Sequence, residues 1–160
     1  MAPGSGKGSG SVHEVALRML GRRALSRREV ADRLARRGFN PAAVRAELHR
    51  LEAAGLLDDQ AVAAAVVAGA LRRGGGRLMA AAALRRRRVA REAADGALGA
   101  VDEEAARAAL EQALSRAARR HPGFERLPEV RRKVVRYLLA RGFGAAEIRA
   151  AIAERTRANR

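Results

Sequence analysis

Residues 36–40 read RRGFN and residues 140–144 read ARGFG, so two of the three phenylalanines lie in nearly the same local phrase. The match extends without a gap over residues 30–48 and 134–152, and every pair is offset by 104 positions. Identical pairs include Val30 with Val134, Leu34 with Leu138 and Arg45 with Arg149. Self-similarity at a fixed offset indicates a repeated supersecondary unit.

The residues around the first phrase predict two helices joined by a tight turn. Ser26 and Glu29 form a capping-box pattern, which begins a helix that should end at Gly38. Gly38 can adopt the left-handed conformation that closes helices, and Phe39 then places its ring in the core between two helices. Asn40 and the proline after it are suited to begin the next helix.

The rest of the chain reads as helices as well, and no Val/Ile/Thr alternation predicts a strand. A third, weaker copy follows the first at an offset of 50, with Leu84 in the place of Leu34, Val89 in the place of Phe39 and Arg88 in the place of Gly38. We therefore predict an all-α protein of three tandem three-helix repeats, stacked into an elongated, curved array. The expected parts are a disordered Gly/Ser tail at 1–11 and repeats at 12–56, 57–100 and 101–158.

The composition is strongly basic, with 33 Lys+Arg against 17 Asp+Glu and a net charge of +16. Such a surplus predicts a polyanionic partner, either a nucleic acid or an acidic protein surface. The chain has no cysteine, which excludes disulfides, thiolate metal sites and a cysteine nucleophile. No apolar run reaches the roughly 18 residues of a membrane helix, and no secretory signal is visible. We expect a soluble, cytoplasmic protein that does not bind membranes.

The basic residues form clusters, each of which is a candidate for partner contact. The central cluster should form a saddle on both sides of the glycines at 74–76; it comprises Arg72, Arg73, Arg77, Arg85, Arg86, Arg87 and Arg88. The second cluster comprises Arg131, Arg132, Lys133 and Arg136. A weaker candidate surrounds the first capping box and comprises Arg22, Arg23, Arg27 and Arg28. The alternative for all of them is a solvated helical face.

No pattern indicates catalysis, a metal or a cofactor. Asp58 and Asp59 precede a helix, so helix capping explains them better than acid/base chemistry. The three histidines are scattered without ligand spacing, and the glycines at 74–76 lack the Lys-Ser/Thr of a phosphate-binding loop. We predict no enzyme activity, no cofactor and no metal.

Four pieces in order resemble the RecX family of regulatory proteins, which modulate the RecA recombinase. They are ALRMLGRRALSRREVADRLARRGF at 16–39, LEAAGLLDD at 51–59, the glycines and the RLMAAAAL after them at 74–84, and VVRYLLARGF at 134–143. The resemblance implies three tandem three-helix repeats that lodge in the groove of the RecA–DNA filament. It also implies restraint of ATP hydrolysis, strand exchange and co-protease activity in DNA repair and the SOS response. The family usually keeps a glycine where this chain has Arg88.

Two other functions stay open on the sequence alone. Residues 26–57 also resemble a helix-turn-helix, which would make the chain a DNA-binding protein. The arginines could also reflect composition alone, in a helical scaffold. For the RecA regulator, direct contact with single- or double-stranded DNA is a further possibility. Nothing resembles a coiled-coil seam, so we expect a monomer.

Overall fold

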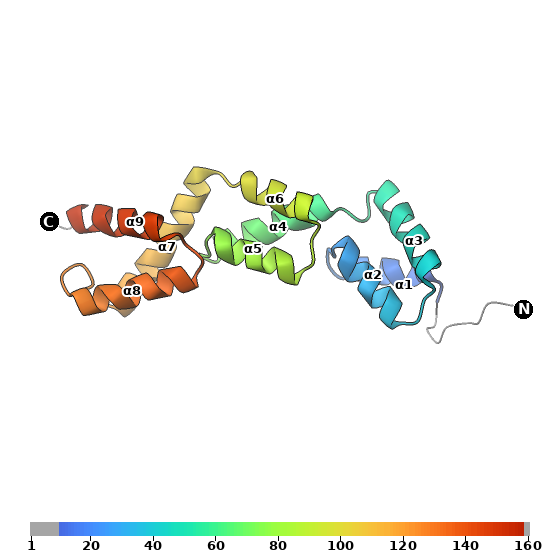
Figure 1. Cartoon of the computed structure of the whole chain (residues 1–160), viewed down its shortest axis with the longest axis horizontal. Helices are drawn as coiled ribbons and strands as arrows, with labels where there is room; N and C mark the ends of the chain where they lie inside the picture. Colours follow the sequence, from blue (N-terminus) through green and yellow to red (C-terminus); the bar gives the residue numbers. More distant parts are fainter. Residues whose placement is uncertain (1–9, 159–160) are drawn as a thin grey trace, which may run out of the picture.

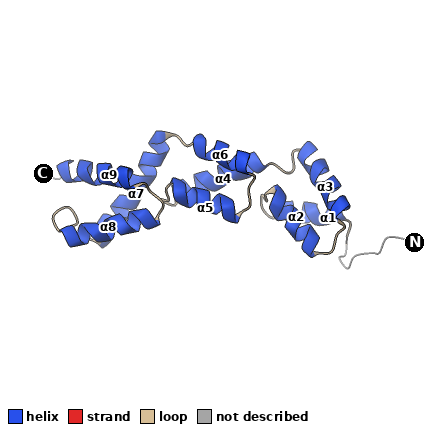
Figure 2. Ribbon diagram, in the orientation of Figure 1, coloured by secondary structure: helices blue, strands red, loops and turns tan. Residues whose placement is uncertain are grey.

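The chain folds into a row of short helices without strands, in the computed structural model of residues 10–158 (Figures 1 and 2). Each helix is followed by a short turn or loop, and the molecule is long and narrow (Figure 1). The all-α prediction is confirmed. The described helices are α1 (Val12–Leu20), α2 (Arg27–Arg36), α3 (Pro41–Ala53), α4 (Asp59–Arg72), α5 (Arg77–Arg86), α6 (Arg91–Gly99), α7 (Glu103–Arg120), α8 (Pro128–Ala140) and α9 (Ala145–Ala158).

Three hydrophobic clusters follow one another along the chain, and each is formed by three consecutive helices. We call α1–α3 unit 1, α4–α6 unit 2 and α7–α9 unit 3. Unit 1 buries residues such as Val30, Leu34 and Leu48, and unit 3 buries their repeat partners Val134, Leu138 and Ile152. In unit 2 the expected third copy also packs inward, with Leu84 buried and Val89, Ala94 and Leu98 partly buried against it. The expected repeat boundaries fall between α3 and α4 and between α6 and α7, and they stay predictions.

Side-chain caps begin several of these helices, as the sequence predicts. The capping box of Ser26 and Glu29 is present, and Asn40 accepts from the main-chain N–H of the next helix. Asp58 caps α4, whereas Asp102 stands at the N-cap of α7 without a capping bond from its side chain. Ser11, which the sequence analysis placed in the disordered tail, is instead the N-cap of α1 and forms a capping box with Glu14. The remainder of that expected tail, residues 1–9, lies outside the described residues.

The repeated phrase ends the second helix of every unit with the same turn. Gly38 has a φ of 82° and Gly142 a φ of 84°, as the left-handed helix ending requires. Arg88 adopts this conformation too, with a φ of 51°, although a side chain is disfavoured there. Phe143 is buried as expected, but Phe39 is only partly buried at the edge of the unit 1 core. Phe39 therefore packs against the unit 1 core as expected, but it is less completely buried than Phe143.

The second helices of the three units lie end to end. In Figure 1, α8, α5 and α2 follow one another from left to right along the lower side of the molecule. The end of α8 meets the start of α5, and the end of α5 meets the start of α2. Each contact between units thus brings a helix C-terminus to a helix N-terminus, so the helix dipoles align favourably.

Candidate partner-binding surface

The contact between units 1 and 2, which we call joint 1, is built around Arg87 at the end of α5. Its guanidinium donates to the Glu29 carboxylate at 2.7 Å and to the main-chain carbonyl of Ala24 at 2.6 Å. The hydroxyl of Ser26 donates to the Arg87 carbonyl at 2.7 Å. Arg87 therefore supplies both a donor fork and an acceptor to the start of α2, and it is structural as well as charged.

Two further residues complete joint 1. The guanidinium of Arg88 pairs with the carboxylate of Asp32, one turn along α2. Asp59 accepts from the main-chain N–H of Arg27 at 2.7 Å and from that of Ala90 at 3.1 Å, so one carboxylate connects the starts of α2 and α6. Of the two aspartates that the sequence assigns to capping, Asp58 caps α4 and Asp59 connects two units.

The contacts in joint 1 favour the ionised form of the Glu29 carboxyl group. Partial burial of the carboxyl group opposes its ionisation, but hydrogen bonds from Arg87, the Ser26 main chain and Arg23 favour the ionised form. Together with the positive charge of Arg87, these bonds lower the pKa of Glu29 to about 2 from 4.5. The carboxylate is therefore ionised at neutral pH and able to hold both arginines.

The contact between units 2 and 3, joint 2, repeats the same arrangement with Arg141 at the end of α8. Its guanidinium donates to the carbonyl of Gly74 at 2.9 Å and also to that of Arg73. Main-chain N–H groups at the start of α5 donate to the carbonyls of Arg141 and Gly142, at 2.8 and 3.1 Å. A Cβ on Gly142 would collide with the main-chain nitrogen of Met79, so joint 2 requires glycine there.

In unit 3, the carbonyls before α8 are bound by Arg131 of the same unit. The carbonyls before α8 are those of Phe124 and Glu125, and both accept from the Arg131 guanidinium. Glu125 lies two residues before the N-cap of α8, as Ala24 and Gly74 lie two residues before the N-caps of α2 and α5. Arg131 thus occupies the place that the arginine of a following unit would take.

The predicted central saddle is divided between the two ends of α5. Arg72, Arg73 and Arg77 lie beside joint 2, and the run from Arg85 to Arg88 lies beside joint 1, roughly 13 Å away along the helix. Arg77 donates to the carbonyl of Val101 at 3.1 Å. The remaining members of the central and second clusters, apart from Arg131, are exposed and have no hydrogen-bond or ion-pair partner from their side chains within residues 10–158; they are Arg72, Arg73, Arg85, Arg86, Arg132, Lys133 and Arg136.

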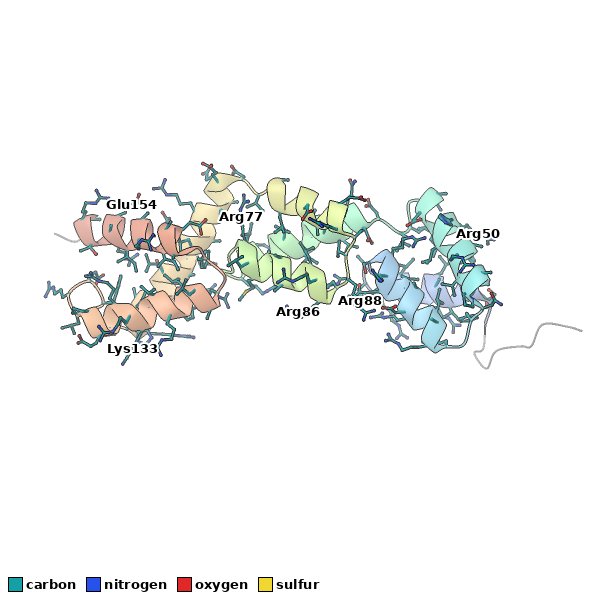
Figure 3. All side chains as sticks on the ribbon, viewed as in Figure 1. Arg50, Arg77, Arg86, Arg88, Lys133 and Glu154 are labelled. Carbon is teal, nitrogen blue, oxygen red and sulfur yellow. The ribbon has the colours of Figure 1, made fainter. Side chains whose placement is uncertain are left out.

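Exposed basic side chains therefore lie along the row of α8 and α5. Figure 3 shows Lys133 on α8 and Arg86 on α5 pointing to the same side of the molecule. An arginine without an intramolecular partner can bind a carboxylate or a phosphate with two parallel hydrogen bonds. This arrangement can hold an extended acidic surface through several contacts.

A surface hollow of about 830 Å³ lies over joint 1 and joins two of the predicted clusters. Arg27 and Arg28 of unit 1 line it together with Arg85 and Arg88 of unit 2. Its floor includes the apolar side chains of Leu84, Val89 and Leu98, while Asp32, Asp59 and Asp95 balance part of the charge. The sequence places these two clusters far apart, and the joint brings them together.

The sequence reading missed a second basic hollow, of about 780 Å³, between α1 and the end of α2. Arg33, Arg36 and Arg37 line it from α2, and Arg22 and Arg23 line it from the turn after α1. The signal was present in the sequence, because residues 33, 36 and 37 recur at helical spacing beside the first phrase. No group of three or more His, Asp or Glu in the described part of the chain could hold a metal ion.

Head-to-tail three-helix units with exposed arginines define a helical tandem-repeat protein with a basic surface. Two models of the RecX family match the chain: the first three-helix domain at residues 13–51 and the third three-helix domain at residues 102–152. The regulatory protein RecX of Halorhodospira halophila is 40% identical over 152 residues, which cover 93% of this chain and 91% of that protein. The chain belongs to the RecX family of regulatory proteins.

Solved structures share this fold. The crystal structure of RecX from Lactobacillus salivarius superposes with a TM-score of 0.79 at 20% identity, covering 89% of this chain and 93% of that one. A second structure of regulatory protein RecX gives a TM-score of 0.76 at 19% identity, over 89% of this chain and 70% of that one. Among the described helices, none is both long and apolar enough to cross a bilayer.

Proposed function

We propose that this protein regulates the RecA recombinase by lying in the groove of the RecA–DNA filament. There it bridges neighbouring RecA protomers and mainly inhibits ATP hydrolysis, strand exchange and co-protease activity, in DNA repair and the SOS response. Membership of the RecX family supports the regulatory role. In this proposal the protein is a cytoplasmic monomer that acts by binding and has no enzymatic reaction of its own.

One observation carries the mode of binding. The arginines that hold the units together are distinct from those that face outward, since Arg87 and Arg141 are committed to the joints. Arg85 and Arg86 are exposed and have no partner in the described chain, although Arg85 also lines the hollow over joint 1. A long, narrow array with outward charges on successive units can contact more than one subunit, and several modest contacts then act together.

The test is a double charge reversal, Arg85→Glu with Arg86→Glu, assayed on the DNA-dependent ATPase of RecA over a range of protein concentrations. We expect wild-type protein to inhibit at or below stoichiometric amounts and the variant to need at least about tenfold more. Each glutamate would repel an acidic group of the partner that the arginine attracts. Arg45→Glu with Arg149→Glu is the matched control, since both residues are exposed, lie on α3 and α9, and give the same change in net charge.

Circular dichroism should show the same helix content in all three proteins. Failure of folded wild-type protein to inhibit RecA would contradict the proposed function. Equal loss of inhibition in both double variants would contradict the assignment of the surface, because it would reduce the effect to net charge.

The helix-turn-helix alternative places α3 in the position of a recognition helix. The exposed residues in the first turns of α3 are Pro41, Ala42, Ala43, Arg45 and Ala46, and of these only Arg45 has a side chain that can donate to a base edge. Fluorescence anisotropy on DNA without RecA separates the two functions. Tight, sequence-dependent binding would support a transcription factor, whereas weak, strongly salt-dependent binding is expected of any chain with this net charge.

A further inference from the structure

The ends of α5 and α8 each contact the start of another second helix. The end of α2 contacts no such helix start within the described residues. Arg37 lies where Arg87 lies in joint 1 and where Arg141 lies in joint 2, since all three are the C-cap residues of second helices. Arg37 is exposed, and neither its guanidinium nor its carbonyl has a partner within residues 10–158. The same local structure is therefore occupied twice in the molecule and open once.

The surroundings of Gly38 and Gly142 differ between the open end and joint 2. A Cβ on Gly142 would collide with the start of α5, whereas a Cβ on Gly38 would meet nothing within 4 Å. The φ angles of the two glycines differ by only 2° (82° and 84°), so the turns are alike and their surroundings differ. Phe39, which is partly buried, marks the same open edge.

We propose that this open end is a docking site for the N-terminus of a helix in a partner protein. The occupied joints define what fits: one or two main-chain carbonyls before the helix, an N–H or hydroxyl donor at its start and, in joint 1, a carboxylate in its first turn. Ala24, Ser26 and Glu29 supply these groups in joint 1. The proposal rests on the proposed function, because it takes the partner to be a helix of the RecA filament.

Charge and hydrogen-bond chemistry favour a protein helix over a nucleic acid at this site. The hollow beside Arg37 is lined by six arginines, so either partner would gain from electrostatic attraction. The open end also presents a carbonyl acceptor at Arg37, as the closed joints do at Arg87 and Arg141. A phosphate offers only acceptors to such a site, whereas a helix start offers acceptors and N–H donors together.

A second copy of this chain does not supply the matching surface. The only second-helix start of the described chain outside the two joints is that of α8, and Arg131 already donates to the carbonyls before it. Head-to-tail association through this site would need those bonds to break. Within the described residues no free second-helix start matches this site, which favours an occupant from another protein.

The experiment uses the full chain and RecA filaments assembled on single-stranded DNA with a slowly hydrolysed nucleotide. Binding is measured by cosedimentation for wild-type protein, Arg37→Ala, Arg37→Lys and the control Arg45→Ala. We expect Arg37→Ala and Arg37→Lys each to weaken binding about tenfold, because lysine keeps the charge but lacks the two-armed donor. The control should bind like wild type, and circular dichroism should show all four proteins folded.

A photo-reactive benzoylphenylalanine in place of Arg36 locates the contact. We expect cross-links to RecA, in the first turn of a helix that carries an acidic residue. Cross-links to the DNA, or full affinity in Arg37→Lys with loss in Arg37→Ala, would overturn the proposal in favour of a polyanion site. Unchanged binding of Arg37→Ala would overturn it while leaving the proposed function intact, and absence of wild-type binding to RecA would overturn both.

Discussion

Arg87 and Arg141 end successive second helices, and each donates to the main-chain carbonyl that lies two residues before the N-cap in the preceding unit. The acceptors are Ala24 in unit 1 and Gly74 in unit 2. The array is therefore held by a repeated polar contact in addition to its separate hydrophobic clusters. Since hydrogen bonds to charged groups contribute more than neutral ones, these arginines should matter for stability.

Arg87→Ala should lower the free energy of unfolding by roughly 2 kcal/mol, because it leaves Glu29 and the Ala24 carbonyl without their main donor. Its neighbour Arg86 is exposed and without a partner in the described chain, so Arg86→Ala should change stability by less than about 0.5 kcal/mol. Urea unfolding followed by circular dichroism measures both values. Similar effects of the two substitutions would contradict a structural role for Arg87.

Joint 1 should weaken in acid. The pKa of Glu29 is about 2 in the folded chain against 4.5 as its ordinary value, so the folded state favours the ionised form. The resulting stabilisation is present above about pH 4.5 and is lost as the pH falls through 4.5 towards 2. Urea midpoints measured between pH 7 and pH 2 should show this decline.

Glu29→Gln is the control for that pH series, since it removes the titrating group. The variant should be less stable than wild type at neutral pH, and the gap between the two should close as the pH approaches 2. A gap that stays constant over the range would show that ionisation of Glu29 does not stabilise the fold.

The two glycines of the repeated phrase should respond differently to alanine. Gly142→Ala adds a Cβ against the main chain of α5 at a positive φ, and should cost roughly 2–4 kcal/mol. Gly38→Ala meets the same backbone penalty in open space, and should cost about 1 kcal/mol. Thermal unfolding measures the difference, and equal costs would argue against tight contact at joint 2.

The turn at Arg88 gives a test of backbone strain. Arg88→Gly and Arg88→Ala both remove the ion pair to Asp32, so the difference between them isolates the positive φ. The glycine variant should be about 1 kcal/mol more stable than the alanine variant, since glycine adopts this conformation without steric cost. Equal melting temperatures would show that the turn relaxes when the ion pair is lost.

The sequence predicts the helices well because their signals are local. Ser26 with Glu29, and Asn40 before Pro41, cap helices through contacts within three residues, and the repeat offset aligns Val30 with Val134 as core positions. Local chemistry is sufficient to predict where these helices begin.

The binding surface is less predictable, because the fate of an arginine depends on the neighbouring unit. Arg86 and Arg87 are adjacent and chemically identical, yet one faces solvent and the other contacts Glu29 across joint 1. Arg131 likewise belongs to a predicted cluster and is committed to the carbonyls before α8. Packing between units decides the role of Arg87, and a contact within unit 3 decides that of Arg131.

Because Arg131 already binds the carbonyls before α8, the two ends of the array differ in how readily a further unit could be added. A unit appended after α9 would find the carbonyls before α8 already taken. A unit fused ahead of α1 would bring a helix start to Arg37, where the donor fork and the carbonyl stand ready. Lengthening such a protein by gene duplication or by design is therefore easier at its amino end than at its carboxyl end.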